Sequence, residues 1–175
     1  PKEFAQKIIE NEGGLEKAKK LFNSKSDMKS EYKPTPVPKN SVGAKYSDIL
    51  KKIFNTNYDF SDYARAASIY WPGNRFGHGR EDIEKFWKLI KEALSNIKFS
   101  VEHIGYLEEP NKNHKASIRW FLEANHSNNT SEFGEATNKK IFVLGINHAE
   151  INDGNVIREW VLFDEVAIWK QILMK

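Results

Sequence analysis

Long segments with the residue pattern of β-strands dominate the second half of the chain, and this feature limits the fold more than any other. Four such segments cover residues 98–109, 114–126, 139–151 and 156–172, and β-branched and aromatic residues are frequent in them. The Asn-Asp-Gly sequence at 152–154 is typical of a tight hairpin turn. Because strands joined by short connections pair antiparallel, the pattern predicts an antiparallel sheet.

Helical patterns precede these strands. Residues 47–55 combine an N-cap at Ser47 with apolar residues at helical spacing. Residues 80–96 form the clearest helix, with acids in its first turn. Its single apolar stripe consists of Ile83, Phe86, Trp87, Ile90 and Leu94.

A shorter strand and two turns separate the two helices. We expect a helical turn at residues 60–64, a strand at 67–71 and a turn at 72–79, where glycines follow Pro72. The order of elements is therefore helices first and then a run of antiparallel strands. This order predicts the α+β class, with the helices packed on one face of the sheet.

The first 40 residues differ from the rest. Residues 3–23 have a helical pattern that Gly13 and Gly14 interrupt, so we expect a break there. The alternating prolines that follow, Pro34, Pro36 and Pro38, favour an extended linker. We therefore divide the chain into a helical extension with a Pro-rich linker (1–40) and a domain (41–175). Because the chain begins with proline rather than methionine, the extension is either an appendage or the end of an upstream segment.

Composition narrows the class of protein. The 175 residues suffice for one core, and the absence of cysteine excludes disulfides, a thiol nucleophile and thiolate metal sites. No apolar run reaches the roughly 18 residues that a membrane span needs, and there is no secretory leader, so we expect a cytoplasmic protein without membrane contact. Residues 1–57 hold 12 Lys and 7 acids, which favours a solvated helix surface over a site for nucleic acid or anionic lipid.

Signals for metals, nucleotides and nucleic acids are weak. His103, His114, His126 and His148 lie in different strands or loops, without the short spacing of metal ligands. There is no phosphate-binding loop and no Gly-x-Ser-x-Gly elbow. We therefore expect no metal, no cofactor and no nucleic-acid partner.

Asp164 at the end of the last strand pattern is the first candidate for catalysis. With a period of two, one strand face carries Val156, Arg158, Trp160, Leu162 and Asp164. If Trp160 faces a cavity, Asp164 points the same way. Poor solvation beside Trp and Leu raises the pKa of a carboxyl group, as an acid/base catalyst requires. The alternative is a structural Asp that forms a salt bridge or caps a turn.

His148 is the second candidate. It shares a strand face with Glu150 and, across the hairpin, stands opposite the Trp160 side of the last strand. This placement would let it approach the cavity and share protons with Asp164. The alternative is a buried histidine with a structural hydrogen bond.

Further residues are candidates for the lining of a binding site. Arg119 and Trp120 are adjacent in a strand and must face opposite sides; we favour Trp120 as the inner one, and His126 shares its side. An inward Arg119 would stabilise an anion or enolate, whereas an outward one would pair with an acid. Trp71, Trp87 and Trp160 are candidates for the cavity wall, with plain core as the alternative, and Tyr63 for a hydroxyl donor.

Residues 46–173 resemble the SnoaL-like polyketide cyclase family, within the nuclear transport factor 2-like superfamily. The resemblance depends on three segments in order: YARAASIYWPGNRFGHGREDIEKFW, SIRWFLEANH, and FGEATNKKIFVLGINHAEINDGNVIREWVLFDEVAIWKQI. It implies a cone, in which a strongly curved antiparallel sheet wraps around a long helix and a deep apolar cavity opens at one end. It also implies homodimers through the outer sheet face.

The resemblance also suggests an activity. The Asp at the position of Asp164 acts in this family as general acid and base in a cofactor-free aldol ring closure, and the family's strand histidine corresponds either to His148 or to Glu150. We therefore expect cyclisation or isomerisation of a hydrophobic carbonyl compound. The alternatives are a non-catalytic ligand-binding or dimerisation module, and an accessory domain of a larger chain.

Overall fold

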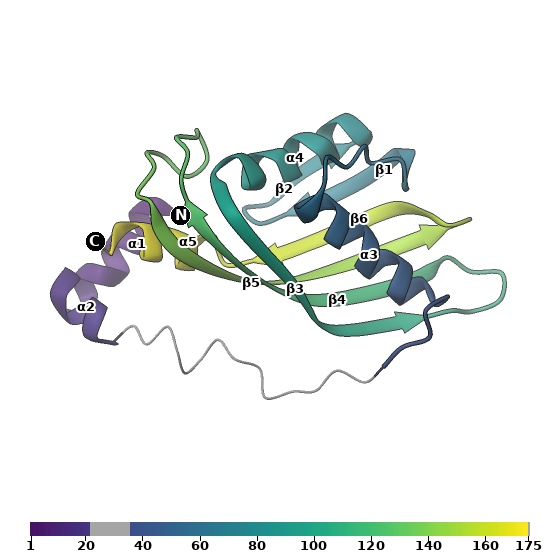
Figure 1. Cartoon of the computed structure of the whole chain (residues 1–175), viewed down its shortest axis with the longest axis horizontal. Helices are drawn as coiled ribbons and strands as arrows, with labels where there is room; N and C mark the ends of the chain where they lie inside the picture. The colour runs from purple at the N-terminus through teal and green to yellow at the C-terminus, as the bar shows by residue number, and fades with distance from the viewer. Residues whose placement is uncertain (22–35, 175) are drawn as a thin grey trace.

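The computed structural model describes residues 1–21 and 36–174 (Figure 1). Within these residues, six strands form one sheet in the order β2-β1-β6-β5-β4-β3. They are β1 (Tyr63–Trp71), β2 (Arg75–His78), β3 (Leu94–Leu107), β4 (His114–His126), β5 (Lys139–Asn152) and β6 (Asn155–Phe163). Neighbours pair antiparallel except β1 and β6, which pair parallel, so the expectation of a wholly antiparallel sheet is wrong at this place. The chain between β1 and β6 is long enough for the return crossing that a parallel pair needs.

Two helices cover the concave face of the sheet. Helix α3 (Val42–Asn55) packs on β3 and β4, and helix α4 (Arg80–Glu92) packs on β1, β2 and β3. Figure 1 shows β3, β4 and β5 curving around this helical layer. Alternate residues of β4 are buried beneath the helices, as its period of two requires. The predicted α+β arrangement, with helices on one sheet face, is confirmed.

Helix α3 begins six residues earlier than its sequence pattern predicts. Ser41 is the N-cap, and its hydroxyl accepts a hydrogen bond from Ala44 N at 3.2 Å. Glu108 accepts a second one from Val42 N at 2.7 Å. The expected cap, Ser47, lies buried inside the helix instead. A long-range carboxylate therefore helps to fix where the helix begins, and local sequence patterns do not contain it.

The segment between the two helices contains more strand than expected. Strand β1 begins at Tyr63, and the predicted helical turn reduces to a turn at Phe60, whose φ is +56°. The predicted turn at 72–79 contains the short strand β2, which pairs with β1. Gly77 lies at the crossing with α4, where a Cβ atom would come within 2.8 Å of the Asp82 side chain.

The last strand ends before its sequence pattern does. Strand β6 stops at Phe163, and helix α5 (Glu165–Leu173) follows, capped by the Asp164 side chain, which accepts a hydrogen bond from Ala167 N at 3.0 Å. The interpretation of residues 156–172 as one strand is therefore wrong beyond Phe163. An Asp followed by a Glu indicates the start of a helix. The apolar residues on both sides of this pair instead favoured the interpretation as one continuous strand.

The N-terminal residues pack against α5. Helices α1 (Lys2–Asn11) and α2 (Leu15–Leu21) are separated at Gly13 and Gly14, both with positive φ, so the predicted break is confirmed. Lys170 of α5 binds Glu12 at 2.5 Å. Pro34 lies outside the described residues, and Pro36 and Pro38 have no regular secondary structure.

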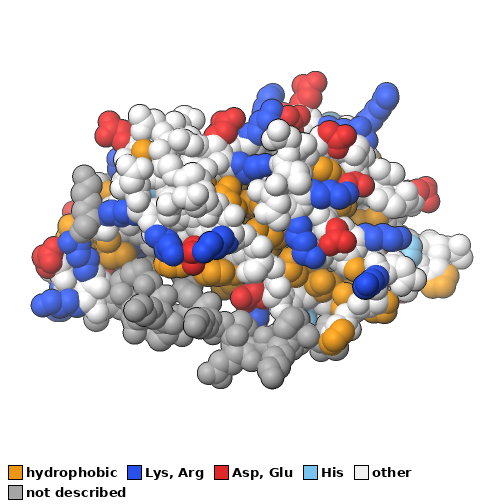
Figure 2. Space-filling view, viewed as in Figure 1, with side chains coloured by type: hydrophobic (Ala, Val, Ile, Leu, Met, Phe, Trp, Pro, Cys, Tyr) orange, Lys and Arg blue, Asp and Glu red, His pale blue; other side chains and the backbone are white. Residues whose placement is uncertain are grey.

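The surface carries both signs of charge. Figure 2 shows Lys and Arg side chains interspersed with Asp and Glu on the face that carries α3, with hydrophobic side chains visible between them. In the described part of the chain, no helix is both long and apolar enough to cross a membrane.

Candidate functional site

Strand β6 presents its apolar alternate residues to the helices. Glu159, Val161 and Phe163 are buried on the inner face, whereas Trp160 and Leu162 are 37% and 67% exposed on the outer face. The expectation that Trp160 faces the interior is therefore wrong. The inner face carries a carboxylate instead, because Glu159 is completely buried.

Four different elements supply hydrogen-bond donors to Glu159. The Tyr46 hydroxyl of α3 donates to Oε1, and the Asn147 Nδ2 of β5 donates to the same oxygen at 2.9 Å. The Tyr63 hydroxyl of β1 lies 3.1 Å from both carboxylate oxygens. The Trp87 indole of α4 donates to Oε2 at 3.4 Å. The fold thus places one carboxylate where two helices and two strands converge.

A further tryptophan holds Asn147 in place. Trp120 Nε1 donates to Asn147 Oδ1 at 2.7 Å, which leaves the amide nitrogen to face Glu159 and the Tyr46 hydroxyl. The Trp120 ring fits only because position 145 is glycine: a Cβ atom there would lie 2.0 Å from the ring. We call these six residues the Glu159 cluster: Tyr46, Tyr63, Trp87, Trp120, Asn147 and Glu159.

Burial dominates the electrostatics of the cluster. Desolvation raises the pKa of Glu159, and the hydrogen bonds from Tyr46, Asn147, Tyr63 and Trp87 oppose that rise. Desolvation, followed by the charge of Glu159, raises the pKa of both tyrosines well above its usual value. In the described residues, no ion pair includes Glu159. A buried carboxyl held by neutral donors can both take up and release a proton.

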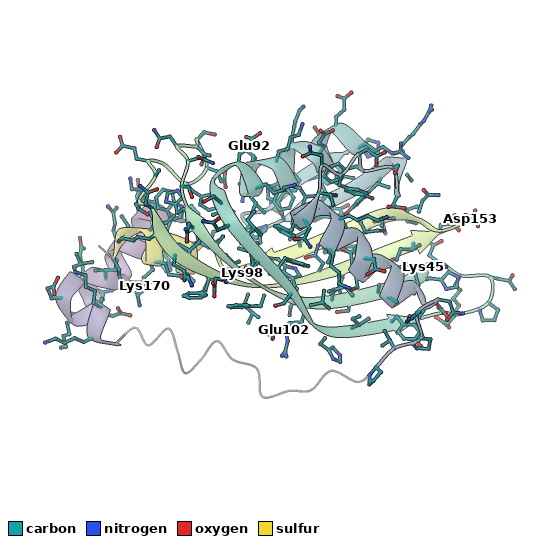
Figure 3. The ribbon with its side chains drawn as sticks, viewed as in Figure 1. Lys45, Glu92, Lys98, Glu102, Asp153 and Lys170 are labelled. Atoms are coloured by element: carbon teal, nitrogen blue, oxygen red, sulfur yellow. The ribbon has the colours of Figure 1, made fainter. Side chains whose placement is uncertain are left out.

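A cleft between α3 and α4 shares one residue, Trp87, with this cluster. Its volume is about 420 Å³, and its lining is Ile53, Asn57, Tyr58, Phe60, Glu84, Trp87, Lys88, Lys91 and Glu92. Trp87 belongs to both places, because its ring lines the α3/α4 cleft while its indole N–H points to Glu159. Glu92, which Figure 3 labels, lies at the end of α4 and is one of the lining residues. Deeper in the core, between Trp120 and Phe163, a space of only about 10 Å³ remains.

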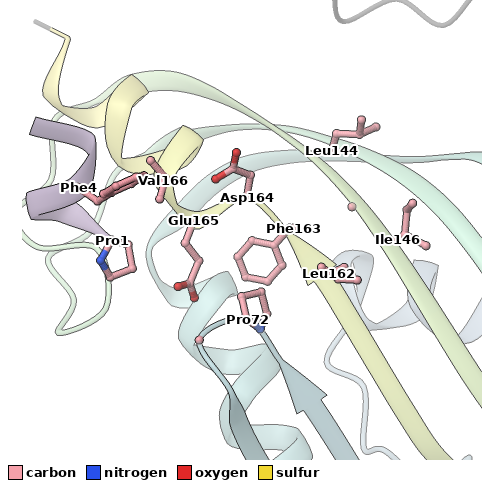
Figure 4. Close-up of a pocket in the computed structure, with 12 residues that line it drawn as sticks. Pro1, Phe4, Pro72, Leu144, Ile146, Leu162, Phe163, Asp164, Glu165 and Val166 are labelled. Atoms are coloured by element: carbon pink, nitrogen blue, oxygen red, sulfur yellow. The ribbon is translucent and has the colours of Figure 1, made fainter. Parts of the chain in front are cut away.

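A second cleft lies on the outer face of the sheet, beside the start of α5 (Figure 4). Its volume is about 730 Å³, and its walls are mainly apolar, with Phe4, Leu144, Ile146, Leu162 and Val166 among them. Asp164 is part of this outer cleft. Its side chain is exposed and serves as the cap of α5.

Comparison with known proteins places this chain in a family. The profile of SnoaL-like polyketide cyclases matches residues 54–172, which contain five of the six residues of the Glu159 cluster. The chain belongs to the SnoaL-like polyketide cyclase family. The resemblance inferred from the sequence is therefore confirmed.

Solved structures show the same fold at low sequence identity. A protein of Jannaschia sp. CCS1 described as a SnoaL-like polyketide cyclase is 12% identical with a TM-score of 0.61, over 78% of this chain and 97% of that one. One from Shewanella putrefaciens is 12% identical with a TM-score of 0.62, over 79% and 88%. IdmH of Streptomyces antibioticus, described as a polyketide cyclase, is 14% identical with a TM-score of 0.61, over 75% and 97%. A search of curated protein sequences gives no significant match.

The structure does not bring the two predicted catalytic residues of this SnoaL-like protein together. His148 is exposed on the outer face and pairs with Trp160, as the hairpin predicts, but that side faces outward. Ile146 pairs with Leu162, so Asp164 stands four residues along the sheet from His148, about 13 Å at the usual strand rise. Their catalytic role stays a prediction, and it lacks the direct contact that proton sharing needs.

Several predicted binding residues point inward. Trp120 is the inner member of its pair, as favoured, and Arg119 pairs with Glu102 at 3.5 Å. Tyr63 and Trp87 belong to the Glu159 cluster. The remaining candidates lie elsewhere: Trp71 stacks on Phe86, His126 is buried beside Thr137 at 3.2 Å, Glu150 pairs with Arg158 at 3.0 Å, and Trp160 stacks on Tyr70.

Sequence analysis missed Glu159, Tyr46 and Asn147. One signal was available for Glu159, because its strand face also carries Val161 and Phe163, and a charge among apolar residues of one strand face indicates a buried role. Asn147 likewise interrupts an alternating apolar series in β5. Tyr46 offered no such signal. Among the described residues, no group of three or more His, Asp or Glu is arranged to hold a metal ion.

Proposed function

We propose that this protein binds a small hydrophobic carbonyl compound and uses Glu159 as a general acid and base on it. The observation that carries the proposal is the complete burial of Glu159 among four neutral hydrogen-bond donors. Desolvation moves the pKa of this carboxyl upward, toward the pH at which acid/base catalysts work. Family membership supports a small-molecule substrate.

The proposed chemistry needs no cofactor. The Glu159 carboxylate removes a proton from the carbon beside a carbonyl group, and the resulting enolate attacks a second carbonyl carbon of the same molecule. A carbon–carbon bond forms, and the alkoxide that results takes the proton back from Glu159. Once protonated, Glu159 needs fewer donors, which frees the Tyr63 hydroxyl to stabilise the enolate oxygen. Without an internal electrophile, the same proton transfer isomerises the substrate.

The substrate reaches Glu159 through the α3/α4 cleft. Trp87 is the wall between the cleft and the carboxylate, because it contacts both. A change in the Trp87 side chain is therefore part of the proposal, since Glu159 has no exposed surface. Conformational gating of this kind is common in enzymes that exclude water from a reacting group.

Deuterium exchange into a simple ketone tests the role of Glu159. The α-protons of 2-tetralone exchange with D₂O, and NMR measures the rate with wild type, Glu159→Gln and Asp164→Asn. We expect Glu159→Gln to lose about 100-fold or more of the protein-dependent rate, a normal share for a general base. Asp164→Asn should exchange at the wild-type rate, and thermal unfolding confirms that both variants fold.

The outcomes separate the two carboxylates. Wild-type exchange in Glu159→Gln overturns the proposal, and loss in Asp164→Asn alone returns the catalytic role to Asp164. If wild type does not accelerate exchange above the buffer rate, the non-catalytic alternative is favoured.

The outer face of the sheet favours the alternative function, a binding or dimerisation module. This face exposes several large hydrophobic side chains, whereas the interior is closely packed. This outer patch consists of Tyr70, Phe76, Leu144, Ile146, Trp160 and Leu162. We propose that a second copy of the chain covers it, because contiguous apolar patches on soluble proteins mark interaction sites. Sedimentation should give a dimer for wild type and a monomer for Leu162→Glu; equal masses contradict the dimer.

A further inference from the structure

The α3/α4 cleft contains one ammonium group that no acid neutralises within the described residues. Helix α4 carries three lysines. Lys85 binds Asp82 at 3.6 Å and Lys88 binds Glu84 at 2.5 Å. Lys91 forms no ion pair in the part of the chain that the structure describes, and its Nζ donates to the backbone oxygen of Thr56 at 3.0 Å.

Lys91 is also partly withdrawn from water. Its side chain is half-buried at the cleft wall, and burial lowers the pKa of its ammonium group. An ammonium group has three donors, and the hydrogen bond to Thr56 uses one. A lysine in the last turn of a helix is favourable by itself, because the helix dipole attracts a cation there. That attraction does not satisfy the remaining donors, whereas a carboxylate in the cleft would do so.

The rest of the cleft suits a flat ring. Tyr58 and Phe60 have ring centroids 4.9 Å apart, and both line the cleft. The Tyr58 hydroxyl is already bound to Asp62 at 2.8 Å. Trp87, which has no exposed surface, also belongs to the lining, and the volume of about 420 Å³ falls within the range of small-molecule sites. The acids at the cleft are Glu84, which is paired, and Glu92, which is exposed at the helix end.

The spacing of Lys91 and Trp87 fixes how a ligand would lie. They are four residues apart on α4, which puts them on the same side of the helix and about 6 Å apart along its axis. A molecule with its carboxylate on Lys91 would therefore place its ring system against Trp87. Its far end would point toward Glu159, whose Oε2 is 3.4 Å from the Trp87 indole nitrogen.

We propose that the α3/α4 cleft selects a ring-containing carboxylic acid, with Lys91 holding the carboxylate and Trp87 the ring. This inference rests on the proposed function, because it names the class of substrate that approaches Glu159. The reacting carbonyl group lies on the ring side of the molecule, away from the carboxylate that Lys91 holds.

A pair of probes of equal size tests the inference by binding alone. The full chain is titrated with 2-naphthoate and with the neutral 2-naphthamide, and NMR follows the Trp87 indole N–H signal, assigned with Trp87→Phe. We expect naphthoate to shift this signal and to bind about 10-fold more tightly than naphthamide. Lys91→Met should remove that preference, whereas the matched control Lys85→Met, outside the cleft, should keep it.

Each outcome of this titration either supports or overturns the proposal. Equal affinities for the two probes in wild type, or a preference that survives in Lys91→Met, overturns the selection of a carboxylate. A Trp87 signal that neither probe shifts overturns the cleft as a ligand site. The exchange experiment uses 2-tetralone, which has no carboxylate, whereas this experiment measures only the binding of the two naphthyl probes, so failure of the one and failure of the other remain distinguishable.

Discussion

Glu159 and Asp164 lie close together in the chain, but their surroundings differ. Glu159 lies on the inner face of β6, whereas Asp164 lies at the exposed end of that strand. Glu159 is completely buried, receives hydrogen bonds from four elements and has a raised pKa. Asp164 is exposed, and Ala167 N donates to it as the cap of α5. The same chemical group is thus buried and hydrogen-bonded from several elements in one place, and caps a helix at the surface in the other. Burial and hydrogen-bond donors make the difference, and residue type does not.

The largest stability effect expected from this comparison concerns the packing behind Glu159. Gly145→Ala would place a Cβ atom 2.0–2.4 Å from three atoms of the Trp120 ring, which must then move and release Asn147. We expect the free energy of unfolding to fall by about 2–3 kcal/mol, as overpacked cores do. Urea denaturation measures the change.

The matched control for this variant is a glycine elsewhere in the sheet. At Gly105 an added Cβ would meet only Ser117, whose Cβ and backbone oxygen lie at ordinary distances of 3.8 and 3.9 Å. Gly105→Ala should change the free energy of unfolding by about 1 kcal/mol or less. Equal effects at the two positions would contradict the claim that Trp120 depends on Gly145.

The next effect is the pH dependence of stability that the buried Glu159 carboxyl should cause. The pKa of Glu159 is raised above its ordinary value of 4.5 in the folded state, so between the two values the folded protein binds more protons than the unfolded chain. Its contribution to stability is complete below the unfolded value and is lost as pH rises through the folded value. The difference in free energy of unfolding between wild type and Glu159→Gln should therefore decrease with rising pH.

Denaturation series at several pH values measure this difference. A Glu159→Gln difference that stays constant or grows with pH would contradict a raised pKa and, with it, the acid/base proposal.

The sequence predicts the frame of the fold better than its site. Apolar periodicity places helix α4 and the strands β3 to β6, and the Asp153–Gly154 turn has the positive φ angles that its residues favour. Short elements are harder to predict from the sequence. The four residues of β2, for example, are too few to show the alternation of a strand. The start of α3 depends partly on Glu108, a distant residue that no local pattern reveals.

The sequence does not predict the Glu159 cluster, for a different reason. A period of two sorts Glu159 with Val161 and Phe163 correctly, but it does not say which strand face is the inner one. The size of Trp160 suggested the wrong face. The partners of Glu159 are distant as well: Tyr46 precedes it by 113 residues, and only the folded chain brings them together.

Loss of the Asp164 cap of α5 should lower the stability of the protein less than the Gly145 substitution in the core. Asp164→Ala removes the acceptor for Ala167 N and should lower the free energy of unfolding by about 1 kcal/mol, whereas Asp164→Asn should cost a few tenths, since Asn caps nearly as well. Thermal unfolding of the two variants measures the difference. Equal losses from Ala and Asn would show that the negative charge matters more than the hydrogen bond.

The smallest expected effect belongs to the ion pair on the outer face of β5 and β6. Glu150 and Arg158 meet at 3.0 Å with side chains 20% and 47% exposed, and exposed pairs of this kind contribute about 0.5 kcal/mol or less. A double-mutant cycle with Glu150→Gln and Arg158→Gln measures the coupling, and each single variant controls for changes outside the pair.

Since water screens this pair and not Glu159, the coupling should also weaken with added salt. A coupling well above 1 kcal/mol that salt does not weaken would mean that the outer face is shielded from water in solution, as a second copy on the apolar patch would cause.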